Sequence, residues 1–372
     1  MKLFKKVAVL VLMGLISLSF GITPIYASAN TILGPEVTNY IQSRGNTVSV
    51  GVYDANTGKT YTYNPSKTYY TESVVKMSML ANVLYKKTPI TSYENSLLTK
   101  MIENSNNSAA STIWRQLGSE QKVQPFFQKV GMLHTTAGTG GWWGRTTTTV
   151  SDQLIMMKYF AFRNALLTDS QRAYGLNLMR HVQLDQRWGT GYGIPSGVSI
   201  ALKNGWVTSN PPSKLYVNSV GYINGQGKNY VIAVLTTNNK SFSYGKDTIN
   251  KISSLVWNEV PASFPVIGYI DAPANNSTII GKSIVKGWFL DKNVVSKVEI
   301  LVDGILAGKA VYSDTRLDVQ KAYPQYNNSK AGFHYLLDTT KYSNGKHTVT
   351  IRETSMNGRV TTLPGKTVTV KH

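Results

Sequence analysis

The sequence contains no cysteine, and this absence excludes several kinds of chemistry at once. Disulfide bridges, cysteine nucleophiles and zinc sites built from thiolates are all ruled out. A lipid anchor of the lipoprotein type is ruled out as well, because it needs a cysteine directly after the export signal. Stability must therefore come from buried cores, and the chain is long enough for two of them.

Acidic residues are scarce: 19 Asp and Glu face 39 Lys and Arg, which gives a net charge of +20. A basic surface attracts polyanions, and for an exported protein these are anionic cell-wall polymers or anionic lipid surfaces. No nucleic-acid recognition motif accompanies the charge, so nucleic acid is not an expected partner. A generally basic surface without a specific anion site is the other interpretation that the charge allows.

Long apolar runs are missing after the first 29 residues, so no transmembrane segment is expected. At the start, lysines precede the apolar run 7–20, and Ala27-Ser28-Ala29 forms a small-x-small cleavage pattern. Residues 1–29 are therefore predicted to be a signal peptide. The expected location of the mature protein is secreted and extracellular, free or associated with the cell wall.

Residues 30–260 are expected to form an α/β domain. Two strand-like segments come first, helical segments follow, and three strand-like segments and a helix end the region. This order predicts an antiparallel sheet in which the N- and C-terminal segments pair, with helices on both faces. The expected helices are 31–44, 71–87, 92–118, 122–130, 150–164, 169–182 and 244–260.

Residues 261–265, PASFP, are expected to be a linker, and residues 266–372 read as strands only. Turn dipeptides such as Asn344-Gly345 separate alternating segments, and roughly seven short strands in about a hundred residues fit an all-β immunoglobulin-like sandwich. The segments WFLD, VDG, GFHYLLD and NGKHTVTI resemble the Ig-like repeats appended to bacterial wall enzymes.

Ser73 and Lys76 stand at the start of the helix expected at 71–87, where Thr71 is expected to cap the first turn. Their spacing puts both side chains on one helix face. A buried lysine that loses its proton easily can act as base towards a serine hydroxyl. Ser-x-x-Lys occurs five times in the chain, so the pattern gains meaning only from motifs elsewhere.

Two further motifs follow in order. Ser105-Asn106-Asn107 ends a helical segment, where a loop would expose short polar side chains. Lys203-Asn204-Gly205 lies inside the strand-like run SIALKNGWV. There, glycine lets an extended ligand lie against the strand and lysine offers charge to a carboxylate.

Ser-x-x-Lys opening a helix, Ser-x-Asn on a loop and Lys-x-Gly on a late strand resemble the penicillin-recognising serine hydrolases. These are the class A β-lactamases and the D-Ala-D-Ala peptidases, and the resemblance covers about residues 31–260. It implies that Ser73 is the acylated nucleophile, that Lys76 is its general base and that Ser105 passes a proton to the leaving nitrogen. No cofactor and no metal is implied.

The resemblance also implies a substrate-binding set. Asn107 would hold Lys76 and the amide carbonyl of the substrate, and Lys203 would bind the substrate carboxylate. Asn204 stands where the family has Thr or Ser, and its amide would hydrogen-bond the same carboxylate. The oxyanion hole would be made by the backbone N–H groups of Ser73 and of Trp206, the residue after Gly205.

One departure from the family bears on turnover. Class A β-lactamases carry a loop glutamate that activates the deacylating water, but no acid lies between Glu120 and Asp152, where the loop reads GTGGWWGRTTTT. Acylation by β-lactams or by cell-wall stem peptides is therefore expected, with slow deacylation. A β-lactamase-like serine hydrolase is the first expectation and a D-Ala-D-Ala carboxypeptidase the second.

Other readings of the sequence remain open. A Ser-His-Asp hydrolase would have to use His134 or His181, and no Gly-x-Ser-x-Gly is present. A His-Glu-x-x-His metal motif is absent too. The main alternative is a catalytically weak cell-wall binding or adhesion module on the same fold. Trp142 and Trp143 could form an exposed substrate platform or pack under the loop.

Overall fold

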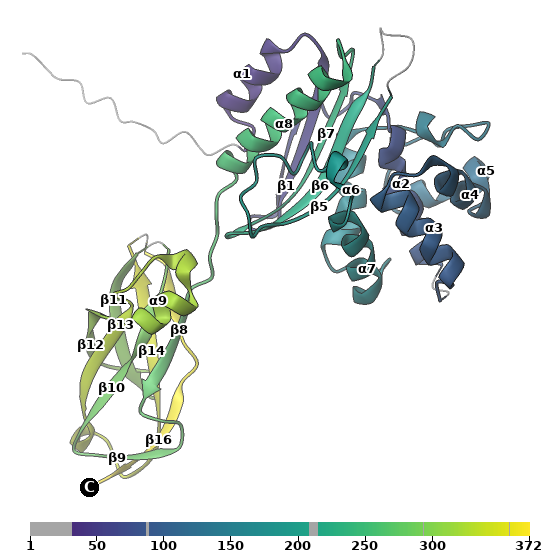
Figure 1. Ribbon diagram of the computed structural model, residues 1–372. Helices are drawn as coiled ribbons and strands as arrows, with labels where there is room; N and C mark the ends of the chain where they lie inside the picture. The colour runs from purple at the N-terminus through teal and green to yellow at the C-terminus, as the bar shows by residue number, and fades with distance from the viewer. Residues whose placement is uncertain (1–31, 87–88, 208–214, 293, 357) are drawn as a thin grey trace, which may run out of the picture.

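The computed structural model describes residues 32–86, 89–207, 215–292, 294–356 and 358–372, and Figure 1 shows the arrangement of their helices and strands. The expected signal peptide, residues 1–29, lies outside these described residues. Among the described helices, none combines the length and the apolar character needed to cross a membrane.

A five-stranded antiparallel sheet with the order β2-β1-β7-β6-β5 forms the centre of the first domain. Thr47 at the start of the domain pairs with Thr237 near its end, so the expected pairing of the two terminal segments is confirmed. The short strands β3 and β4 pair separately. The strands are β1 (Thr47–Asp54), β2 (Lys59–Tyr63), β3 (Tyr69–Tyr70), β4 (Thr147–Thr148), β5 (Ser199–Trp206), β6 (Val217–Gly225) and β7 (Lys228–Thr237).

Helices cover both faces of this sheet, as expected (Figure 1). Side chains alternate between the faces of a strand, so Val231 and Ala233 of β7 enter one core while Ile232 and Val234 enter the other. The second of these cores lies under α1 (Pro35–Ser43) and α8 (Phe242–Glu259). The first core contains α2 (Val75–Tyr85), α3 (Ser92–Glu103), α4 (Asn107–Gln116), α5 (Ser119–Lys129), α6 (Val150–Ala161) and α7 (Asp169–Arg180).

Two details of the expected helices are wrong. Thr71 makes no capping hydrogen bond, because a 3-10 turn, Glu72–Val74, precedes α2, and the Thr71 hydroxyl donates to the Gly144 carbonyl at 3.4 Å instead. The single helix expected at 92–118 is two helices, because the chain turns at Ser105 with a left-handed φ of 53°.

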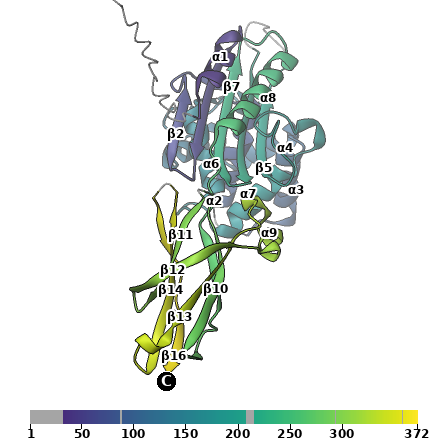
Figure 2. The same ribbon diagram turned by 90° about the vertical axis from the view of Figure 1, so that its left-hand side faces the viewer.

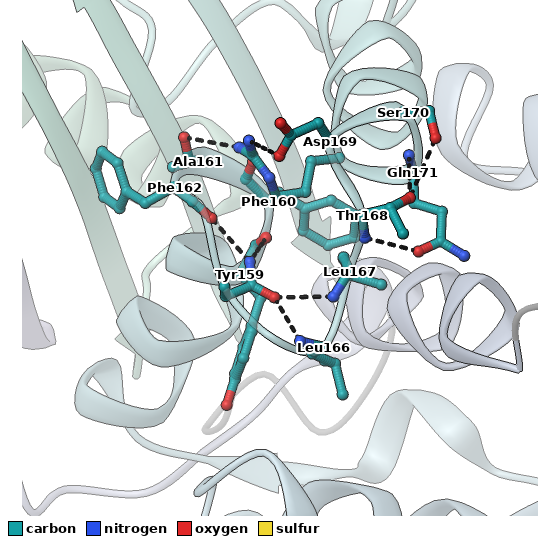
Figure 3. Close-up of polar contacts among 12 residues, drawn as sticks. Tyr159, Phe160, Ala161, Phe162, Leu166, Leu167, Thr168, Asp169, Ser170 and Gln171 are labelled. Atoms are coloured by element: carbon teal, nitrogen blue, oxygen red, sulfur yellow. Dashed lines mark hydrogen bonds and ion pairs between the residues drawn. The ribbon is translucent and has the colours of Figure 1, made fainter.

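The connection between α6 and α7 is fixed by polar contacts, which Figure 3 shows. Asn164 Oδ1 accepts from the backbone N–H of Leu166 at 2.9 Å and of Leu167 at 2.8 Å. Thr168 and Gln171 form a reciprocal capping box at the start of α7. Gln171 Nε2 also donates to the carbonyl of Leu84 at 2.6 Å, which ties α7 to the last turn of α2. The helix that follows Ser73 is thereby held at both ends.

The second region is a β-sandwich of nine strands: eight follow the order β8-β10-β13-β12-β11-β14-β16-β9, and the ninth, β15, pairs with β14. In Figure 2 the long strands run side by side. Val298, Ile300 and Val302 of β11 alternate into a core closed by Phe333 from the facing layer. The elements are β8 (Ile267–Ala272), β9 (Ser277–Ile280), β10 (Lys282–Leu290), β11 (Val295–Val302), β12 (Ile305–Asp314), α9 (Leu317–Ala322), β13 (Gly332–Asp338), β14 (Gly345–Ser355), β15 (Val360–Thr362) and β16 (Lys366–Lys371).

Glu353 of β14 is a carboxyl group inside this sandwich. Its side chain is fully buried, and neither of its oxygens has a hydrogen-bond partner in the described part of the chain. Burial raises the pKa of Glu353 to about 7, Asp291 adds to the rise, and Arg359 acts against it. Because this pKa lies above the ordinary value of 4.5, the folded state binds a proton that the unfolded state releases.

The stability of the sandwich should therefore fall as the pH rises from about 4.5 to about 7, with Glu353 contributing on the order of 3 kcal/mol. Glu353→Gln should remove most of the slope below pH 6.5, where the raised pKa of His347 does not yet contribute, whereas Glu299→Gln, which removes a paired carboxylate of low pKa, should leave that slope in place. Chemical unfolding of the three proteins at pH 5 to 8 measures this. A flat wild-type profile would contradict the prediction.

Candidate active site

Ser73 lies in the 3-10 turn that leads into α2, at a point where the chain is held from two sides. The backbone N–H of Thr71 donates to the carbonyl of Thr146 at 2.8 Å, and Asn218 Nδ2 donates to the carbonyl of Tyr70 at 2.8 Å. Glu72, directly before the serine, has a left-handed φ of 48°. Non-glycine residues adopt this conformation only where their surroundings enforce it, and such residues concentrate at functional sites.

Lys76 is fully buried one turn after Ser73. Its Nζ donates to the Ser105 carbonyl at 2.6 Å, to Asn107 Oδ1 at 2.8 Å and to Ser105 Oγ at 3.2 Å. Desolvation of the ammonium group lowers the pKa of Lys76 to about 7. A lysine with this pKa is partly neutral near neutral pH and can accept a proton.

Ser105 stands in the left-handed turn between α3 and α4, and the loop before β5 supports this turn. The backbone N–H of Gln183 donates to the Glu103 carbonyl at 3.0 Å, and Gln186 Nε2 donates to the Asn104 carbonyl at 3.2 Å. The turn aims the Ser105 hydroxyl between the two site lysines.

Lys203 of β5 reaches the same hydroxyl from the sheet. Its Nζ donates to Ser105 Oγ at 2.9 Å and to the Asn204 carbonyl at 3.0 Å, and the side chain is fully buried. Complete desolvation lowers the pKa of Lys203 well below its usual range, and the nearby charge of Lys76 lowers it further. Ser105 thus lies between two amines that are both easier to deprotonate than an exposed lysine.

Gly205 brings β5 against the turn that holds Ser73. A methyl group on Gly205 would lie 2.7 Å from the backbone nitrogens of both Ser73 and Val74, and 2.6 Å from the Thr71 carbonyl. Only glycine fits this close backbone approach. The strand therefore runs next to the Ser73 N–H, which is where an oxyanion hole shared with the following residue, Trp206, would have to be.

The structure brings together Ser105, Asn107 and Lys203 around Lys76, but it turns the Asn204 side chain away. Asn204 Nδ2 donates to the carbonyls of Gln186 at 2.8 Å and Trp188 at 3.1 Å, so its amide nitrogen is engaged away from Ser105. The reason is the alternation of side chains along β5. The Trp206 ring likewise packs against Trp188 and Phe242, which leaves only its backbone for the site.

The loop before α6 contributes residues whose position the sequence did not reveal. The Trp143 ring lies over Lys76, with its centroid 4.7 Å from Nζ, whereas Trp142 is 63% exposed. Of the two adjacent tryptophans, Trp143 packs inside the site and Trp142 is exposed. Glu72 lies beside the same loop, since a methyl group added at Gly144 would be 3.2 Å from its Oε2. Burial raises the pKa of Glu72 to about 7, while Arg145 acts against the rise.

Two family models match this chain. Residues 84–260 match the model of the beta-lactamase enzyme family. The first domain is β-lactamase-like. Residues 268–351 match the model of the bacterial Ig domain, in agreement with the sandwich. The first match begins after Ser73 and Lys76, so the case for those two residues rests on their own geometry.

Proteins similar to the first domain occur among curated proteins and among solved structures. The curated "Putative lipoprotein LppW" of Mycobacterium tuberculosis is 24% identical over 215 residues, 54% of this chain and 66% of the relative, so this chain spans just under two thirds of the length of the curated relatives it matches. The crystal structure of TLA-1 extended-spectrum β-lactamase has a TM-score of 0.54 at 20% identity, over 60% of this chain and 96% of the other. The structure of PBP-A has a TM-score of 0.53 at 17% identity, over 62% of this chain and 95% of the other. These structures share the fold.

Gly205→Ala should damage the site through packing. The added methyl group meets three backbone atoms that belong to the Ser73 turn, so we expect a loss of about 1–3 kcal/mol of stability and a shifted Ser73. Gly45→Ala is the matched control, because its methyl group would lie 3.9 Å from its nearest neighbour, a lysine side chain. Thermal unfolding and labelling of Ser73 by a β-lactam measure both effects. Equal behaviour of the two variants would contradict the expected role of Gly205.

Proposed function

We propose that the protein is a serine hydrolase that forms an acyl-enzyme on Ser73 with β-lactams or with peptide amides of cell-wall stems. The observation that carries the proposal is Lys76: a buried amine of lowered pKa, three residues after Ser73, held by Ser105 and Asn107 in a β-lactamase-like domain. Burying an amine is costly, and a site that keeps it with a pKa about 7 suits a general base.

The positions of these groups support the following route for acylation. The neutral Lys76 amine accepts the hydroxyl proton of Ser73 as the serine oxygen bonds to the amide carbon. The Ser73 N–H, with that of Trp206, stabilises the negative charge that develops on the carbonyl oxygen. Ser105 passes a proton to the leaving nitrogen as the carbon–nitrogen bond breaks, and it is recharged by the amines on either side, Lys76 and Lys203.

Substrate recognition is proposed to use Lys203 and Asn107. Lys203 places N–H donors beside Ser105, where they can bind a substrate carboxylate next to the scissile amide. Asn107 gives its oxygen to Lys76 at 2.8 Å, which leaves its amide nitrogen for the substrate carbonyl. We further propose that the protein is exported and acts at the cell wall, which the signal-like residues 1–29 and the net charge of +20 support.

The first test is covalent labelling. Purified residues 30–372 mixed with a penicillin should gain the mass of one penicillin, and the adduct should last because no loop carboxylate activates water. Ser73→Ala should show no adduct. Ser78→Ala should still be labelled, because Ser78 is a buried serine of α2, the helix after Ser73, and has no hydrogen-bond partner among the described residues. Intact-protein mass and free antibiotic are followed together. Rapid loss of antibiotic without an adduct would indicate efficient turnover, and no reaction at all would favour a binding module.

The acylation rate should rise with pH and level off above about 7. The base form of Lys76 is the neutral amine, so its reactive fraction grows as the pH passes the lowered pKa. Lys76→Arg should lose at least about a hundredfold in rate at every pH, because a guanidinium group stays protonated. Stopped-flow measurements with a chromogenic β-lactam between pH 5.5 and 9 test this. A rate that falls across pH 7 would argue against Lys76 as the base.

A further inference from the structure

The Lys76 amine contacts three hydrogen-bond acceptors and one aromatic ring. An ammonium group has three N–H donors, and here the Ser105 carbonyl, Asn107 Oδ1 and Ser105 Oγ accept all three. The face of the Trp143 ring covers the amine beyond these contacts, with its centroid 4.7 Å from Nζ. Trp143 thus shields one side of the Lys76 amine from solvent.

The Trp143 ring is anchored by its own contacts. Its Nε1 donates to Ser111 Oγ of α4 at 3.1 Å. The backbone around it is fixed too, because the Arg145 N–H donates to the Trp142 carbonyl at 2.9 Å and the Gly138 N–H donates to Thr146 Oγ1 at 3.1 Å. The ring is therefore a fixed wall of the site.

The neighbouring tryptophan provides a contrast within the same turn. Trp142 is 63% exposed, and its ring contacts the Arg145 guanidinium, 4.9 Å from the centroid, with no contact to Lys76 among the described residues. The two rings have the same chemistry and adjacent positions, but only one reaches the base.

We propose that Trp143 sets the lifetime of the acyl-enzyme by keeping water away from Lys76. This inference rests on the proposed function, since it concerns the ester formed on Ser73. Trp143 is a positioning residue: it touches the base and not the reacting carbonyl. With Trp143 in place, hydrolysis of the ester is slow.

The chemistry that the ring prevents can be written in full. A water oxygen bonds to the acyl carbon while its proton passes to the neutral Lys76 amine. The bond between that carbon and the Ser73 oxygen then breaks, and the serine oxygen takes the proton back from Lys76, which releases a carboxylic acid and the free enzyme. The attack needs a water molecule in contact with both the ester and Lys76. Among the described residues, no carboxylate contacts Lys76.

Three variants test the inference. Trp143→Ala opens the space over Lys76, Trp143→Phe keeps a ring there but loses the hydrogen bond to Ser111, and Trp142→Ala is the matched control. Each full-length mature protein is labelled with a penicillin, freed of excess reagent and followed by intact mass. The acylation rate is measured separately, and thermal unfolding confirms that each variant is folded.

We expect the adduct of Trp143→Ala to decay at least about tenfold faster than that of the wild type, with an acylation rate within about threefold. Trp143→Phe and Trp142→Ala should keep the wild-type lifetime. The separation of the two rates is decisive, because a purely structural role would lower acylation and leave the decay unchanged.

Other outcomes overturn the inference. Equal adduct lifetimes in all four proteins would show that Trp143 does not control water. A faster decay in Trp142→Ala as well would show that general loosening of the loop, and not the ring over Lys76, is responsible. If no protein forms an adduct, the proposed function itself fails and the inference fails with it, so the two failures are distinguishable.

Discussion

The removal of two lysine amines from water is the constraint on which the first domain depends. Lys76 and Lys203 are both fully buried, and moving a charged amine out of water costs several kcal/mol unless acceptors replace its hydration. The chain supplies those acceptors from the turn at Ser105, from Asn107 and from the backbone of β5. The lowered pKa values of both lysines follow from the same burial, so the feature that costs the fold stability is also the one on which the proposed chemistry depends.

Much of this arrangement could be predicted from spacing and order. Ser105, Asn107 and Lys203 were expected beside Lys76, and the structure places all three in hydrogen-bond contact with Lys76 or with the shared Ser105 hydroxyl. The order of the elements also predicted the antiparallel sheet in which the N- and C-terminal strands β1 and β7 pair. The catalytic roles of these residues stay proposals until the labelling experiments are done.

The parts that could not be predicted depend on neighbours distant in the sequence. Strand alternation turns Asn204 away from the site, but the sequence does not reveal its partners there, the carbonyls of Gln186 and Trp188. The side chain of Trp143 was expected to pack or to be exposed, but its contact with Lys76 depends on how the whole loop folds back. Glu353 lies two residues after Ile351, on the core side of β14, but the sequence does not show whether the carboxyl group has a hydrogen-bond donor there.

The distances along the chain between the site residues have a consequence for how reactivity arises. Lys76 hydrogen-bonds Ser105, 29 residues later, and Lys203 hydrogen-bonds Ser105 across 98 residues. Strand β1 pairs with β7, which lies near the end of the domain. Contacts of such long range form late, since loop closure must come before them. The surroundings of Ser73, the proposed nucleophile, are therefore completed only by long-range pairings. Under the proposed acylation, a partly unfolded molecule would not react, and capture of a β-lactam would report a folded domain.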